Sequence, residues 1–237
     1  MSEDKTLMHL IKKVVFAAVA SSMAVFAQNP ITADSPFQIG VATRLDVTDA
    51  VINISNSGAN GNSLYGPGYG GAQGNICANV YAFSQDEQLI SCCSCLVTPN
   101  GLVSLSVNGD LTSNTLTGVV PPEVVVKVLA TATGGTTSSP DYTGTSCAGT
   151  AATVSSLAPA TGLLAWGTST HIVAAGYSTT ETTHGATVYG YNAFTPSTLS
   201  SGELASIENR CRNIIGNGSK FGICGSCRPY GLGAKKK

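Results

Sequence analysis

The cysteines are the residues of this chain whose type and spacing could do chemistry, and there are eight of them. Two groups are close in sequence: Cys92, Cys93 and Cys95, and the pair Cys224 and Cys227. Cysteine sulfur can attach haem, bind zinc or exchange electrons as a dithiol. Each role needs its own spacing or neighbours, so each can be tested against the sequence.

Haem attachment and dithiol chemistry both need a Cys-x-x-Cys pair, which Cys224 and Cys227 supply. Haem attachment also needs a histidine next, and Arg228 stands there instead. A reactive dithiol usually begins a helix, where the helix dipole lowers the thiol pKa. This pair follows a predicted helix, so we interpret it as a structural disulfide pair.

Zinc binding is disfavoured because it needs free thiolates, and the export signal described below argues against them. An even number of cysteines in an exported chain predicts disulfides, and we expect all eight to take part: Cys77, Cys92, Cys93, Cys95, Cys147, Cys211, Cys224 and Cys227. Eight cysteines allow on the order of a hundred pairings, so the connectivity stays open.

Hydrolytic chemistry finds little support. Beyond the N-terminal segment the chain has His171 and His184, which we interpret as surface or loop residues, and no Gly-x-Ser-x-Gly motif. The neighbouring carboxylates Asp86 and Glu87 lie at a predicted hairpin tip, where side chains are solvated. We therefore predict no catalytic, cofactor-binding or metal-binding residue.

The chain carries little charge. Charged residues make up 11% of it and the formal net charge is −1, whereas a typical soluble domain has about 25% charged residues. This excludes the basic surface that nucleic-acid binding needs. Weak charge also lowers the repulsion between copies, which suits a protein that associates.

The N-terminus resembles an export signal. Lys12 and Lys13 precede the apolar run Val14 to Ala27, with a plausible cleavage site before Gln28. The run is short for a membrane span, although a retained anchor is the alternative. We expect residues 1–27 to be removed, no later membrane span, and an extracellular or cell-surface location.

The stretch Ile76 to Val107 predicts two antiparallel strands around a turn at Ser84 to Gln88, and then a third strand. Side chains alternate along a strand, so Cys93 and Cys95 share one face and Cys92 takes the other. A turn centred near Asp86 puts Cys77 on the face of Cys93 and Cys95. We therefore expect Cys77 to bond one of these two, and Cys92 to find its partner elsewhere.

Other strands follow from the same alternation. Phe37 to Leu45 places Phe37, Ile39, Val41, Thr43 and Leu45 on one face, which we expect to be the inward one. Thr48 to Ser55 turns Ala50, Ile52 and Ile54 inward. Trp166 is expected in the core, whereas Thr131 to Thr161 is interpreted as a low-complexity loop outside it.

The C-terminal part changes period. Leu204, Ile207, Cys211 and Ile214 recur at helical spacing, and Ser200 with Glu203 forms a capping-box pattern. Cys211, Cys224 and Cys227 should tie this helix and the tail to each other and to the sheet. We therefore divide the chain into a signal (1–27), a β-sandwich domain (28–198), and a C-terminal helix with a Cys-rich tail (199–237).

Asn56 to Gly74 is a long Gly/Asn-rich loop. Tyr65 and Tyr69 make it a candidate ligand-contacting loop, although a plain surface loop is the commoner case. Asn53 and Asn217 begin Asn-x-Ser glycosylation patterns, and Asn53 lies inside a predicted strand.

Three segments carry a resemblance: Ile76 to Tyr81, Cys92 to Cys95, and Val97 to Pro99. With the C-terminal helix and its Cys-x-x-Cys tail, they resemble a group of uncharacterised exported bacterial β-rich proteins. The resemblance covers much of the chain after the signal and implies no activity. Val51 to Gly58 also resembles an early strand of immunoglobulin-like surface modules. The expected fold is a mainly β, disulfide-stapled sandwich, immunoglobulin-like, with one C-terminal α-helix.

These features favour a non-enzymatic extracellular structural protein, self-assembling as the subunit of a filament or surface layer. The candidate assembly strand contains Phe37, Ile39, Val41 and Leu45, and would complete a neighbour's sheet; pairing within its own sheet is the alternative. The expected partner is a further copy of the chain. The second hypothesis is a module that binds glycan or another surface ligand through Tyr65 and Tyr69. A secreted enzyme of unrecognised type ranks last.

Overall fold

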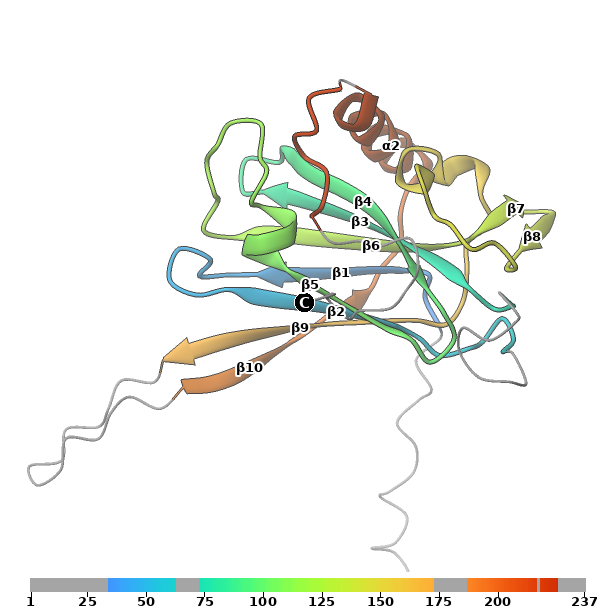
Figure 1. Ribbon diagram of the computed structural model, residues 1–237, viewed down its shortest axis with the longest axis horizontal. Helices are drawn as coiled ribbons and strands as arrows, with labels where there is room; N and C mark the ends of the chain where they lie inside the picture. The colour runs from blue at the N-terminus through green and yellow to red at the C-terminus, as the bar shows by residue number, and fades with distance from the viewer. Residues whose placement is uncertain (1–33, 63–72, 173–186, 217, 226–237) are drawn as a thin grey trace, which may run out of the picture. The chain divides into compact units, whose positions relative to one another are not determined.

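The computed structural model describes residues 34–62, 73–172, 187–216 and 218–225. The chain divides into two units, Met1–Ala33 and Asp34–Lys237. The first unit, with the predicted signal, lies outside the described residues. The second is a mainly β sandwich of two antiparallel sheets with one long helix near its C-terminal end, which confirms the predicted fold class (Figure 1).

The first sheet has the strand order β11-β1-β6-β3-β4. Its strands are β1 (Phe37–Ala42), β3 (Ile76–Ser84), β4 (Leu89–Val97), β6 (Val124–Ala132) and the two-residue β11 (Thr195–Pro196). The predicted hairpin across the Ser84 to Gln88 turn is β3 with β4. Every residue of β3 up to Phe83 is buried, because both faces of this sheet are covered.

The second sheet has the order β10-β9-β2-β5, and the described residues cover it on one face only. Its strands are β2 (Ala50–Asn56), β5 (Leu102–Ser106), β9 (Leu163–Ile172) and β10 (Thr187–Ala193). The smaller elements are β7 (Gly134–Thr136), β8 (Ser139–Asp141), η2 (Val107–Leu111), η3 (Thr150–Ala152) and η4 (Val154–Ser156). The helix α2 (Ser201–Gly216) lies over β3 and β4 of the first sheet (Figure 1).

The main core fills the space between the sheets. Ile52 and Ile54 of β2 pack there with Val80 of β3 and Val126 of β6, all with 1% or less of their surface exposed. The inward orientation predicted for Ala50, Ile52 and Ile54 is confirmed. Burial of this β-branched cluster supplies the hydrophobic stabilisation that holds two twisted sheets together.

A second core lies on the other side of the first sheet, under α2. Ile207 and Cys211 of the helix are buried against Tyr81 and Phe83, as the helical spacing predicts. The Ser200 hydroxyl accepts a hydrogen bond from the Glu203 backbone N–H at 3.1 Å, which is half of the predicted capping box.

The orientation of the β1 side chains differs from the prediction that the apolar face of this strand points inward. Phe37 and Ile39 face the second core under the helix, whereas Ala42 faces the space between the sheets. The Gln38 amide donates to the Leu163 carbonyl at 2.8 Å, which fixes this orientation. Alternation shows which residues of a strand share a face, but it does not show which layer covers that face. The apolar face of β1 points away from the space between the sheets, because the second core covers it.

Two further expectations were wrong. Trp166 is half-buried on the open face of the second sheet, not in the core. The segment Thr131 to Thr161 is not a loop outside the core, since it contains the end of β6 and the buried residues Ala151, Val154 and Ala160. A segment rich in small residues can pack closely against a sheet and be buried, although its composition is also typical of a loop.

Candidate functional site

Three disulfides join distant parts of the described chain: Cys77–Cys147, Cys92–Cys211 and Cys93–Cys224. Cys95 is disulfide-bonded as well, and Cys227 lies outside the described residues. The adjacent Cys92 and Cys93 point to opposite faces of β4, so one bonds the helix and the other bonds the tail. The prediction that Cys211 and Cys224 anchor helix and tail to the sheet is confirmed.

The expected bond from Cys77 to Cys93 or Cys95 was wrong, and a β-bulge explains why. At the hairpin tip Phe83 lies opposite Leu89, the register of a turn centred on Asp86. Between Ala82 and Phe83 the register shifts by one residue, so Cys77 lies opposite Leu96. A one-residue shift moves a side chain to the other face. Cys77 therefore faces the segment that carries Cys147.

The Cys147 segment is also held by a buried polar network on that face. The Asn79 carboxamide oxygen accepts from the hydroxyls of Thr150 at 2.6 Å and Ser94 at 2.8 Å. The Tyr81 hydroxyl donates to the Ala151 carbonyl at 2.8 Å. Burial, and secondarily the Glu208 carboxylate, raises the pKa of Tyr81 far above its ordinary value. Tyr81 is therefore a neutral structural donor.

The edges of the first sheet differ. At the β4 edge, the Cys92 backbone N–H donates to the Gly222 carbonyl at 2.9 Å, and Ile223 forms an isolated parallel bridge with Cys92. The tail therefore covers this edge and the Cys93–Cys224 disulfide locks it there. At the opposite edge, β11 pairs with β1 only at Gln38 and Ile39. On the side away from β6, the remainder of β1 has no strand beside it among the described residues.

Backbone hydrogen bonds of a strand alternate between its two sides, and this alternation shows which peptide groups of β1 face the open edge. The Pro36 carbonyl accepts from the Ala130 N–H of β6, so even-numbered residues of β1 bond β6. Odd-numbered residues point the other way, and the Phe37 carbonyl duly accepts from the Ser197 N–H. The peptide groups of Val41 therefore point at the open edge, past the end of β11.

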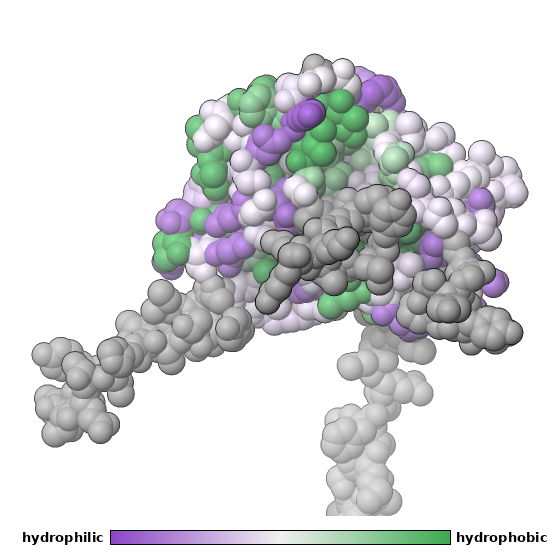
Figure 2. Space-filling view, viewed as in Figure 1, coloured by the Kyte–Doolittle hydropathy of each residue, from purple (hydrophilic) through white to green (hydrophobic). Residues whose placement is uncertain are grey.

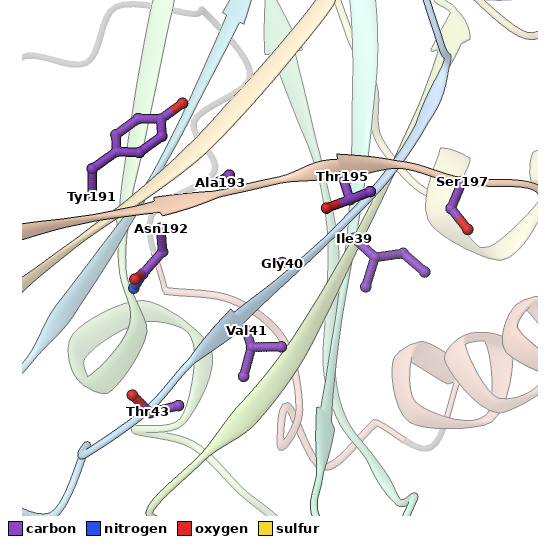
Figure 3. A pocket seen from close by; sticks show the side chains of 9 residues that line it. All are labelled: Ile39, Gly40, Val41, Thr43, Tyr191, Asn192, Ala193, Thr195 and Ser197. Atoms are coloured by element: carbon purple, nitrogen blue, oxygen red, sulfur yellow. The ribbon is translucent and has the colours of Figure 1, made fainter.

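A groove of about 550 Å³ lies beside this edge, where β10 and β1 diverge (Figure 3). Ile39 and Val41 line it from β1, and the Asn192 side chain enters it from β10. Gly40 lies against the Phe194 ring of the main core, since a Cβ at this position would lie 2.3 Å from the ring. The lining side chains carry no charge: Ile39, Gly40, Val41, Thr43, Tyr191, Asn192, Ala193, Thr195 and Ser197.

The four residues of the predicted assembly strand therefore lie in different environments. Ile39 and Val41 line the groove, whereas Phe37 lies in the core under the helix and Leu45 lies in the main core, beyond the end of β1. In this single chain, β1 pairs with its own β6 along all six residues. The edge and its groove were not found from the sequence, because the two-residue β11 has no pattern.

Other candidate residues contribute no described site. Tyr65, Tyr69 and His184 lie outside the described residues, and His171 is placed only by its backbone in β9. Asp86 and Glu87 are exposed at the hairpin tip, as predicted. Within the described ranges, no cluster of three His, Cys, Asp or Glu side chains could hold a metal ion.

Comparison of the chain with family models, with curated proteins and with solved structures gave no match. In the part of the chain that the structure describes, no helix is long and apolar enough to cross a membrane. The three disulfides are compatible with an extracellular protein.

Proposed function

We propose that this protein is an exported, non-enzymatic structural subunit whose copies join by strand addition at the open edge of β1. The observation that carries the proposal is that the backbone N–H and C=O of Val41 point away from β6, toward an uncharged groove, at an edge where no described strand pairs with them. An unpaired strand edge is a template for an incoming strand, which gains main-chain hydrogen bonds along it.

The contrast between the two edges supports this proposal. The chain covers the β4 edge with its own disulfide-bonded tail. Natural proteins protect exposed edges with charges, prolines or bulges. At the β1 edge, Pro196 protects only the first part, and the exposed side chain that follows is Val41, with 45% of its surface accessible.

The proposed occupant is an extended segment of a second copy of the chain. The groove offers neutral side chains and backbone groups, which suit an uncharged strand. Over the face seen in Figure 2, much of the described surface is pale, neither strongly hydrophilic nor strongly hydrophobic, with separate green and purple patches. With 11% charged residues and a net charge of −1, copies repel one another weakly.

The test is the assembly state of the mature, oxidised protein, followed by sedimentation velocity over a concentration series and by negative-stain electron microscopy. Val41→Lys places a charge on the open edge without disturbing the pairing of β1 with β6. Leu116→Lys is the matched control, since Leu116 is also exposed (71%) but does not line the groove. We expect the wild type and the control to form regular assemblies and Val41→Lys to remain monomeric.

Monomers at every concentration of the wild type would refute strand addition, as would assembly of Val41→Lys indistinguishable from the wild type. Deletion of residues 28–45 is unsuitable as a test, because it would remove β1 from between β6 and β11. The alternative function, ligand binding through Tyr65 and Tyr69, stays a prediction.

A further inference from the structure

The outer face of the second sheet combines two aromatic side chains with an amide whose nitrogen has no hydrogen-bond partner among the described residues. Trp166 of β9 lies opposite Asn53 of β2, which lies opposite Ser104 of β5. Tyr191 of β10 lies opposite Thr168, two residues along the strand from Trp166, and therefore on the same face. Tyr191 is 70% exposed and Trp166 is half-buried.

Asn53 is the polar centre of this face. Only 9% of its surface is exposed, and its Oδ1 accepts a hydrogen bond from the Ser104 hydroxyl at 2.7 Å. This bond orients the amide, and the Nδ2 group makes no hydrogen bond to any described residue. Because Nδ2 is not sealed from solvent, it can donate to a ligand lying on the sheet.

The row itself carries no charged side chain, and the Asp49 carboxylate lies at the end of β2, where it accepts a hydrogen bond from the Ser106 hydroxyl. The outward residues around this row are Val51, Ser55, Leu102, Leu164, Thr168 and Ala193. Strands lie about 4.8 Å apart, so the row from β5 to β10 spans about 14 Å. A surface of this length with flat apolar rings beside amide and hydroxyl groups matches a short neutral oligosaccharide, whose C–H faces pack on aromatic rings while its hydroxyls hydrogen-bond.

We propose that this outer face is a binding platform for a neutral glycan, with Trp166 and Tyr191 as stacking residues and Asn53 as a hydrogen-bond donor. An apolar protein surface would leave the Asn53 donor buried and unpaired, which is unfavourable. Nucleic acid would require basic side chains, which this face lacks. Tyr191 and Ala193 also line the groove between β1 and β10, whereas Trp166 and Asn53 do not, so Asn53→Asp tests the platform independently of assembly.

The experiment uses the mature, oxidised protein in native affinity gels that contain soluble neutral polysaccharides: hydroxyethylcellulose, xylan, glucomannan, laminarin or dextran. Six-unit oligosaccharides of any polymer that retards the protein are then measured by calorimetry. We expect at least one polymer to retard it, with an affinity that does not change when salt is raised, because no charged groups take part.

Tyr191→Ala should weaken binding about tenfold, whereas Tyr191→Phe, which keeps the ring, should stay close to the wild type. Asn53→Asp removes the donor at equal size and should weaken binding by a similar factor. Leu116→Ala, at a site of equal exposure away from the sheet face, should bind as the wild type. Circular dichroism and melting temperature verify folding, and Tyr191 is exposed enough for its variants to fold.

Four results would overturn the proposal. The first is no retardation by any polymer; the second is wild-type binding by both Tyr191→Ala and Asn53→Asp. The third is an intact mass showing sugar covalently attached at Asn53, which would make its amide an acceptor of glycosylation and not a binding group. Binding that falls steeply with salt would point to an anionic partner and would also contradict the platform.

Discussion

Removing the Cys77–Cys147 disulfide should destabilise the protein more than removing Cys92–Cys211, although the second bond closes the longer stretch of sequence. The sequence separations are 70 and 119 residues. A disulfide stabilises mainly by limiting the unfolded chain, and the effect grows with the loop that it closes. Sequence separation alone therefore predicts about 4.4 kcal/mol for the first bond and about 4.9 kcal/mol for the second.

The structure reverses this order. Cys93 is bonded to Cys224, so the unfolded chain already holds Cys92 near Cys211 through a shorter route. That route has one residue from Cys92 to Cys93 and 13 from Cys211 to Cys224, a loop of about 14 residues, for which the stabilisation is about 3 kcal/mol. No described disulfide shortens the loop between Cys77 and Cys147.

The two disulfides are buried to a similar extent in the folded state, so their removal can be compared directly. All four sulfurs are buried, with 2% or less of each residue exposed, so replacing each pair by alanines removes similar contacts. The double variants Cys77→Ala/Cys147→Ala and Cys92→Ala/Cys211→Ala would be unfolded in guanidinium under non-reducing conditions and followed by circular dichroism. We expect the first to lose roughly 1 kcal/mol more stability than the second. A larger loss of stability from the second variant would refute the argument that the Cys93–Cys224 bond already shortens the loop closed by Cys92–Cys211.

Three further predictions concern single side chains. Tyr81→Phe leaves a buried carbonyl without its donor and should cost about 1 to 2 kcal/mol in chemical unfolding, and an unchanged midpoint would show that the bond contributes nothing. Gly40→Ala would place a methyl group against the Phe194 ring and should cost about 1 to 3 kcal/mol, measured as a lower melting temperature. Hydrogen bonds from the Thr143 hydroxyl and backbone N–H lower the pKa of Asp141, so its contribution to stability is present above the ordinary carboxyl pKa and is lost as pH falls through the lowered value. An NMR titration in which Thr143→Val leaves that pKa unmoved would contradict the assignment.

Local patterns predicted most of the elements. Alternation located β1, β2, β3, β4 and β5, and the spacing of Ile207 and Cys211 predicted the helix with its buried face. These signals are local, because side-chain direction repeats every two residues in a strand and every 3.6 in a helix. The same signals did not predict β11, whose two residues carry no period.

The alternation of side chains along a strand does not predict which layer of the fold covers each face of the strand. Phe37 and Ile39 were correctly grouped, yet they pack under α2 and not between the sheets. The partner of Cys77 was missed for a related reason, since one bulge at Ala82 and Phe83 exchanges the two faces of β3 relative to β4. Neither the covering helix nor the bulge has a signature at those positions.

The sequence by itself determined that this is a β-rich chain with one C-terminal helix, little charge and an even number of cysteines, because periodicity and composition are properties of neighbouring residues. Only the tertiary structure decided which cysteines meet, which edge of the first sheet the tail covers, and that Trp166, Tyr191 and Asn53 share one open face. Those outcomes depend on register and on packing between segments far apart in the chain, where a shift of one residue reverses the result.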